Sequence, residues 1–332
     1  MTPTFARILA RATRCLRWTD RRLIWVESLL ESRLGDIEID RLRQACKESG
    51  ENLGRFYHWK VEQLALISCM RGLSRDEFLR LVSAADCSDY RLLDDSLADD
   101  GRGLVLAIPH HGHFVLSIIA AAERLRQNRR VSIFYESPAA QSSNAIFDAA
   151  HGCLFGEGGP VSIIHNTRAG LIQAIRELRA GQVVIIMPDV YRNQEETWQI
   201  PFCGGHRNAM LGTAVLSRRT GAKVVPMVSR VGASLFDFAT QFGTLPMPVD
   251  PPSDPVTEVY SDYTVTAAIF ASMEMAMLDQ LYAWQYTRGH RRGVHQQHGS
   301  SPNLTELLAL GELMLHDPRL QPSPTAAFSL TT

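Results

Sequence analysis

The sequence predicts an α/β fold: a mostly parallel sheet flanked by helices, preceded by an N-terminal helical region. Over residues 1–98, apolar residues recur three and four positions apart, which is the period of amphipathic helices. From Leu104 onward, short apolar runs alternate with helical patterns instead. We therefore expect a helical region over residues 1–98 that packs on an α/β domain over residues 99–295. Residues 296–332 are expected to be a partly disordered tail.

The helical region contains four segments with the helical period, and Gly35, Gly50 and Gly72 separate them. Ser74 followed by Glu77 indicates a capping box at the start of the last segment. The segments expected to be helical are 23–34, 39–53, 57–70 and 76–84.

The α/β domain is expected to alternate strands with helices and to end in a long helix. The expected strands are 104–108, 131–135, 161–164, 183–187 and 223–228, and the expected helices are 114–126, 142–150, 168–179 and 209–220. A further β segment, 235–242, is expected at the edge of the sheet. A proline-rich loop over 246–255 then leads to a helix over 264–282, with Asp262 or Thr264 as its cap. The tail contains one short helical pattern, 304–315.

The composition excludes several classes of protein. Of 332 residues, 45% are hydrophobic and 21% are charged, which is typical of a globular protein with a sizeable core. The net charge of −1 gives no general attraction to nucleic acid. The six cysteines have no paired spacing, so we expect reduced thiols in the cytoplasm and neither a disulfide nor a zinc framework. We expect no metal and no cofactor.

The N-terminus is rich in arginine and carries no segment that predicts membrane insertion. It lacks an apolar run of about 18 residues, as a transmembrane helix needs, and the apolar centre of a signal peptide. Within residues 1–33, apolar residues at helical spacing alternate with arginines, a pattern typical of an amphipathic helix at a membrane interface. We expect peripheral contact with the inner membrane, and the alternative is a helix packed on its own domain with a solvated basic face.

Polar side chains follow several of the predicted strands. The carboxyl ends of parallel strands meet in one crevice, so these groups are expected to face one another. They are His110, His111 and His113 after the first strand, Tyr135 and Glu136 after the second, and Asp189 after the strand at 183–187. A histidine in such a crevice can act as a general base. The alternatives are ordinary loop histidines or a metal site, and no carboxylate or cysteine stands at a ligand spacing.

A glycine pair, Gly204 and Gly205, precedes a predicted helix that has Arg207 near its start. A glycine-rich turn at a helix N-terminus can hold an anion, and it can equally be a simple turn.

Five segments together resemble the lysophospholipid acyltransferase superfamily, in its bacterial lipid A lauroyl/myristoyl acyltransferase branch. The resemblance runs from about residue 22 to residue 293 and rests on the order and spacing of these segments. They are GRGLVLAIPHHGHFV, VSIFYESPAAQSSNAIFDAA, LRAGQVVIIMPDV, IPFCGGHRNAMLGTAVLSRRTGAKVVPM and LYAWQYTRGHRR. The resemblance implies a glycerolipid acyltransferase-like fold.

The resemblance also implies a mechanism. In this family a histidine and an acid five residues later form the catalytic pair, and the histidine deprotonates an acceptor hydroxyl that attacks an acyl thioester. Matching the motif places the family's histidine on His110, its glycine on Gly112 and its asparagine on His113. The implied donor is acyl carrier protein or acyl-coenzyme A, and the implied acceptor is a lipid or small molecule with a hydroxyl or amine. The substrate contacts are expected from His111, Gly112, His113, Tyr135, Phe202, Gly204 and Arg207.

The chain departs from the family pattern at three positions of the expected site. The acid position is Val115, the arginine after Tyr135 is Glu136, and the glutamine after Asp189 is Val190. Valine cannot orient an imidazole. We therefore expect Glu136, or failing that Asp189, to hold the second ring nitrogen of His110.

Three functions follow from these residues. The first is an acyltransferase with His110 as base and an apolar channel beside the helix at 114–122. The second is a binding or scaffold protein on the same fold, which the loss of the acid at Val115 favours. The third is a hydrolase or transferase with another nucleophile, for which Cys203 is the candidate.

Overall fold

The computed structural model describes residues 50–97, 101–140, 144–156, 159–190, 197–202, 205–245 and 254–287. The arginine-rich segment, the helices expected before residue 50, the helix expected at 304–315 and the residues Cys203 and Gly204 lie outside the described residues.

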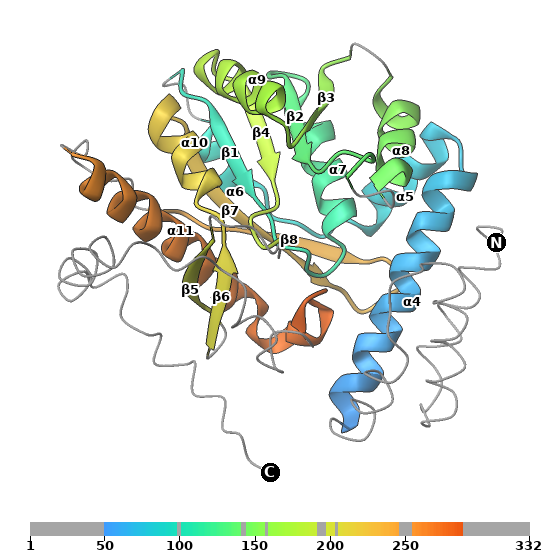
Figure 1. Ribbon diagram of the computed structural model, residues 1–332. Helices are drawn as coiled ribbons and strands as arrows, with labels where there is room; N and C mark the ends of the chain where they lie inside the picture. The colour runs from blue at the N-terminus through green and yellow to red at the C-terminus, as the bar shows by residue number, and fades with distance from the viewer. Residues whose placement is uncertain are drawn as a thin grey trace.

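A six-stranded sheet forms the centre of the molecule (Figure 1). Its strands are β1 (Leu104–Ala107), β2 (Val131–Tyr135), β3 (Val161–His165), β4 (Val183–Ile186), β7 (Lys223–Val231) and β8 (Phe238–Phe242). The spatial order is β3-β2-β4-β1-β7-β8; the first five run parallel, and β8 pairs antiparallel at the edge. The α/β prediction is confirmed.

Helices cover both faces of the sheet (Figure 1). They are α4 (Gly50–Gly72), α5 (Arg75–Ala85), α6 (Arg91–Ser96), α7 (Phe114–Leu125), α8 (Ala145–Phe155), α9 (Arg168–Arg179), α10 (Gly212–Thr220), α11 (Pro255–Met277) and the short 3₁₀ helix η2 (Leu278–Ala283). The apolar residues of α4, α5, α7 and α8 form one core cluster, and those of α9, α10 and α11 form another.

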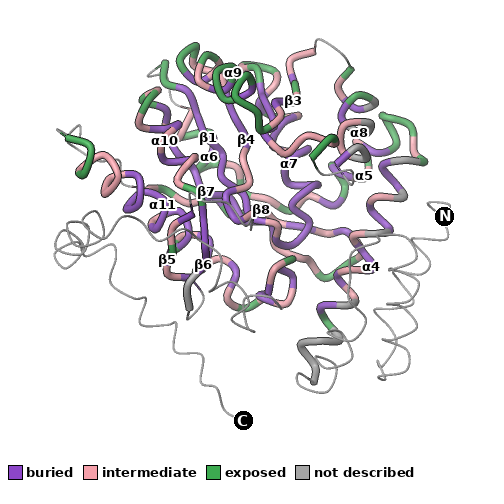
Figure 2. The backbone as a smooth tube through the Cα atoms, viewed as in Figure 1, coloured by how far each residue is buried: buried purple, intermediate pink, exposed green. Residues whose placement is uncertain are grey.

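Strand β1 separates these two clusters and contributes to both. Leu104 and Leu106 belong to the first cluster, and Val105 and Ala107 belong to the second. Because side chains alternate between the faces of a strand, a strand covered on both faces must be apolar at every position. Figure 2 shows these central strands buried. Because β1 is packed on both faces, it fixes the position of the loop that follows it.

A two-stranded antiparallel hairpin, β5 (Trp198–Phe202) and β6 (Gly205–Ala209), lies outside the main sheet. We expected a helix from residue 209, and that helix, α10, begins at Gly212 instead. Pro201 lies inside β5, and proline is tolerated there because the strand has only one hydrogen-bonded neighbour.

The start of the long helix was also predicted wrongly. Helix α11 begins at Pro255, where Asp254 and Thr257 form a capping box, rather than at residue 264. Its first two turns contain no buried residue, so the apolar period that predicts a helix begins later in the sequence. Asp262 instead pairs with Arg218 at 2.9 Å. The capping box of Ser74 and Glu77 is confirmed.

None of the helices that the structure describes combines the length and apolar character that crossing a bilayer requires.

Candidate active site

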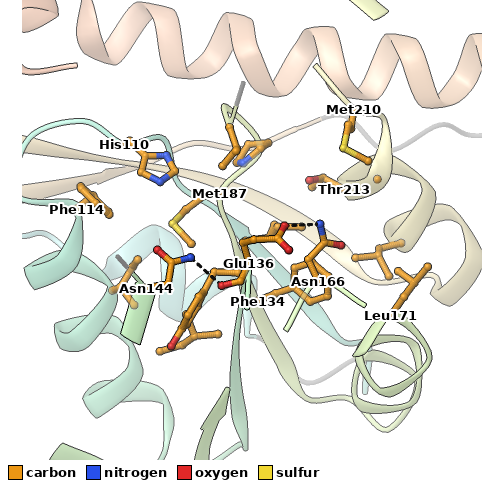
Figure 3. Close-up of a pocket in the computed structure, with 18 of the residues that line it drawn as sticks. His110, Phe114, Phe134, Glu136, Asn144, Asn166, Leu171, Met187, Met210 and Thr213 are labelled. Atoms are coloured by element: carbon orange, nitrogen blue, oxygen red, sulfur yellow. Dashed lines mark hydrogen bonds between the residues drawn. The ribbon is translucent and has the colours of Figure 1, made fainter. Parts of the chain in front are cut away.

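The loops at the carboxyl ends of the parallel strands surround a cavity of about 950 Å³ (Figure 3). His110 follows β1, Glu136 follows β2 and Asn166 follows β3, and all three line the cavity. Most other lining residues are apolar, among them Phe114, Val115, Ile118, Phe134, Phe147, Leu171, Ile186, Met187, Trp198 and Met210. Polar groups at the strand ends therefore border a largely apolar space.

His110 is hydrogen-bonded to Asp189 at the wall of this cavity. Its Nδ1 lies 2.8 Å from Asp189 Oδ1, and its backbone N–H donates to Asp189 Oδ2 at 2.8 Å. The His110 side chain is 15% exposed and that of Asp189 is 1% exposed. With Nδ1 engaged by the carboxylate, Nε2 is the ring nitrogen that a substrate can reach. A histidine oriented in this way is prepared to act as a general base.

Asp189 is held in place by residues from distant parts of the chain. Trp284 Nε1 donates to Asp189 Oδ2 at 2.9 Å, and Arg207 Nη2 donates to the Asp189 carbonyl at 2.6 Å. The Arg207 guanidinium also stacks over the rings of Trp284 and Tyr286. These contacts fix the carboxylate relative to the imidazole.

Asp189 stays ionised despite its burial. Burial acts to raise the pKa of this carboxyl, but the charge of His110, its hydrogen bond and the charge of Arg207 outweigh burial. The pKa of Asp189 is therefore below its usual range. A negative charge beside Nδ1 stabilises the imidazolium that forms when His110 takes a proton.

His111 points away from the cavity and anchors the loop. It is fully buried, with Nδ1 2.7 Å from the Ser229 carbonyl and Nε2 2.9 Å from the Gln280 carbonyl. Burial lowers the pKa of His111, although these two carbonyls act in the opposite direction. The expected substrate contact from His111 is thus replaced by a positioning role.

His113 anchors the same loop to helix α4. Its Nδ1 lies 2.9 Å from Gln63 Nε2, and its Nε2 lies 3.1 Å from Glu62 Oε2. Both His113 and Glu62 are buried. Trp59 Nε1 adds a hydrogen bond to the Gly112 carbonyl at 2.9 Å. His113 therefore also positions the loop, rather than contacting substrate as expected.

Gly112 is required for this tight loop. Its φ is +58°, and a Cβ there would lie 2.1 Å from the Ser229 carbonyl oxygen.

We expect Gly112→Ala to lower the free energy of unfolding by about 2 kcal/mol or more, because backbone strain adds to a steric overlap. Urea denaturation measures this loss. The matched control is Gly152→Ala on α8, where a Cβ meets nothing within 4 Å, and the expected change is small. Equal losses in both variants would contradict this account of Gly112.

Glu136 is not the partner of His110 Nδ1, which corrects the first choice made from the sequence. Its carboxylate accepts a hydrogen bond from Asn166 Nδ2 at 3.2 Å, and its backbone carbonyl accepts one from Asn144 Nδ2 at 2.7 Å (Figure 3). Asp189, the second choice, occupies the orienting position. Glu136 is a carboxylate of the cavity wall.

Tyr135 also lines the cavity, and its hydroxyl donates to Asp148. Burial, together with this hydrogen bond, raises the pKa of the Tyr135 hydroxyl. The neutral phenol is therefore the form present at neutral pH.

Phe202 and Arg207, which were also expected to contact substrate, do not line the cavity. Phe202 is buried beneath Trp284, with ring centroids 5.2 Å apart, and Arg207 is buried behind Asp189. The sequence interpretation missed Trp284, Asn166 and Gln63. Trp284 lies in the segment LYAWQYTRGHRR, so the resemblance contained a signal for it, whereas Gln63 has no distinguishing signal on its helix.

Part of the chain matches the model of a known protein family. Residues 161–254 match the family model described as bacterial lipid A biosynthesis acyltransferase. The matched stretch contains Asp189 and Arg207, while His110, Glu136 and Trp284 lie outside it. No curated protein matches the chain.

Proposed function

We propose that this chain transfers an acyl group from a thioester donor, with His110 as general base. The match over residues 161–254 relates the chain to the bacterial lipid A biosynthesis acyltransferases. The family match supports acyltransferase activity in general. The observation that supports His110 as the general base is the contact of its Nδ1 with the buried Asp189 carboxylate, at the wall of a largely apolar cavity.

In the proposed reaction, His110 Nε2 accepts the proton of the acceptor's hydroxyl or amine. The acceptor atom attacks the thioester carbonyl carbon and forms a new bond to it. The carbon–sulfur bond then breaks, and the leaving thiolate takes the proton from the imidazolium. The donor is acyl carrier protein or acyl-coenzyme A. Asp189 holds the ring in the required tautomer and offsets its positive charge throughout.

The apolar wall beside His110 is the proposed binding surface for the acyl chain. Phe114, Val115 and Ile118, on the first turns of α7, line the cavity. Each methylene that such a wall removes from water contributes about 0.8 kcal/mol. Val115 thus extends the apolar surface at the position where the family has its acid, and the carboxylate comes from Asp189 instead.

The test is mass spectrometry of the purified protein incubated with a thioester donor and a mixture of small hydroxyl and amine acceptors. Lauroyl-coenzyme A and lauroyl-acyl carrier protein are used in parallel. We expect free thiol and a new lauroyl product with at least one donor. Intact thioester with both donors would contradict acyl transfer.

The alternative is a binding protein that retains the fold without catalysis, and the valine at position 115 favours it. Such a protein would bind the lauroyl donor without consuming it. The contact of the buried Asp189 carboxylate with His110 Nδ1 counts against this alternative, because it orients a base that a protein without catalysis does not need.

A further inference from the structure

Resting on the proposed acyl transfer, we infer that the acyl chain which this protein transfers bears a hydroxyl group far from its thioester, and that the His151 side chain binds this hydroxyl. The preferred donor is thus a thioester of a hydroxylated fatty acid rather than of a plain saturated one. The hydroxyl makes a specificity contact and takes no part in the chemistry at His110.

His151, on helix α8, is a buried histidine with an unpaired ring nitrogen. The residue is 8% exposed, and it lines the same cavity as His110. In the part of the chain that the structure describes, its Nδ1 is buried and forms no hydrogen bond. A buried polar atom that has lost its hydration without gaining a partner costs free energy. A polar group on a bound ligand can supply the missing partner.

The His151 ring is neutral, so it can both donate and accept a hydrogen bond. Burial lowers its pKa to about 4, although the charge of Asp148 acts in the opposite direction, and the ring is therefore uncharged at pH 7. A neutral imidazole has one N–H donor and one acceptor nitrogen. A hydroxyl group also donates and accepts, so it pairs with the ring in either tautomer.

Two aromatic rings hold the plane of the His151 imidazole. It stacks on Tyr135 and on Phe155, with ring centroids 6.2 Å and 5.8 Å apart. A half-turn about the Cβ–Cγ bond exchanges Nδ1 with Cδ2 and Nε2 with Cε1, and it leaves the ring plane and both stacking contacts unchanged. Each ring position other than Cγ thus holds a nitrogen in one of the two orientations. Whichever edge faces the cavity, the ring can present a nitrogen to a ligand.

His151 lies on the side of the sheet that we propose for the acyl chain. Val115 and Ile118 of α7 line the cavity and belong to the same core cluster as Tyr135, on which His151 stacks. Figure 3 shows Phe114, at the start of α7, on this side of the cavity. An acyl chain that lies along Val115 and Ile118 is therefore on the same side of the sheet as His151.

The distance from His110 determines where along the chain the hydroxyl lies. Strand β1, which precedes His110, and strand β2, which ends at Tyr135, flank β4, so their ends lie about 10 Å apart, which is two strand spacings. An extended chain advances about 1.2 Å per bond, since a residue with three backbone bonds spans at most about 3.6 Å. A hydroxyl at His151 is therefore roughly eight bonds or more from the thioester carbon. A hydroxyl on the third carbon stays near His110.

The first experiment compares two neutral, unreactive isomers, 10-hydroxydecanamide and 3-hydroxydecanamide. Displacement of a fluorescent fatty acid from the full-length protein gives their relative affinities. We expect the 10-hydroxy isomer to bind about fivefold more tightly or better, which is the effect of one net hydrogen bond of ordinary strength. Equal affinities, or tighter binding of the 3-hydroxy isomer, would overturn the inference, and this comparison within the unaltered protein needs no variant.

Two variants assign the preference to His151. His151→Phe keeps an aromatic ring against Tyr135 and Phe155 and removes both nitrogens, so it should bind the two isomers equally and bind unsubstituted decanamide as the unaltered protein does. The matched control is His165→Phe, because the His165 ring lies 5.8 Å from the same Tyr135 ring but does not line the cavity. The control should keep the preference. A preference that survives His151→Phe unchanged would place the hydroxyl elsewhere and overturn the inference.

An activity measurement separates this inference from the proposed function. Acyl transfer to one acceptor is measured with 10-hydroxydecanoyl-coenzyme A and with 3-hydroxydecanoyl-coenzyme A, and we expect the higher kcat/KM for the first. Consumption of both thioesters with equal kcat/KM would overturn the inference and leave acyl transfer standing. Preferential binding of 10-hydroxydecanamide without consumption of any thioester would overturn the transfer chemistry instead and leave the hydroxyl site at His151 standing.

Discussion

Asp189→Asn is expected to lower kcat for acyl transfer by about 10³- to 10⁴-fold, the size of the loss when a comparable triad acid becomes an amide. Asp189 Oδ2 accepts hydrogen bonds from Trp284 Nε1 and from the His110 backbone N–H. In the variant, the amide oxygen must take this position, so the NH₂ group faces His110 Nδ1. The ring would then carry its proton on Nε2 and could not accept one from the substrate.

Thiol release from lauroyl-coenzyme A measures this loss, and a circular dichroism spectrum and thermal melt verify the fold of the variant. Donor binding is expected to change little, because Asp189 lies behind His110 and does not line the cavity. A variant that keeps more than about a tenth of the rate would show that Asp189 does not orient the base.

The second large effect is expected on stability, from His113→Leu. His113 Nε2 lies 3.1 Å from Glu62 Oε2, and the two side chains are 0% and 2% exposed. Removing one partner of a buried pair of this kind costs about 3 to 5 kcal/mol. We therefore expect the free energy of unfolding from urea denaturation at pH 7 to fall by this amount.

The double variant His113→Leu with Glu62→Met is the matched control for this prediction. It removes both charges and fills the space with apolar side chains, so most of the lost stability should return. Additive losses in the double variant would show that the two residues contribute independently.

The sheet could be predicted from the sequence because its central strands, β1 and β4, are short and apolar on both faces, and amphipathic helices separate most strands along the chain. The hairpin of β5 and β6 could not, since its residues are mixed in polarity and Pro201 interrupts the pattern of a strand. The start of α11 was missed for a related reason. Capping at Asp254 and Pro255 was present, but no apolar stripe accompanied it.

The candidate site was predicted in its location and only partly in its contacts. The sequence analysis placed His110, Glu136 and Asp189 at strand ends, but it could not predict the order of the strands across the sheet. In the structure β4 is the neighbour of β1, and β2 is one strand further away. This order decides that Asp189, rather than Glu136, reaches the imidazole. Trp284 is 95 residues from Asp189 along the chain, so their contact is a property of the tertiary fold.

The central claim is that His110 is the base that drives release of thiol from an acyl thioester. The most direct test compares the rate of thiol release from lauroyl-coenzyme A, with an acceptor present, in the unaltered protein and in His110→Ala. We predict turnover in the unaltered protein and a loss of about 10³-fold or more in a folded variant, as for removal of a general base. Turnover that survives in His110→Ala, or that disappears in Cys203→Ala, would contradict this mechanism.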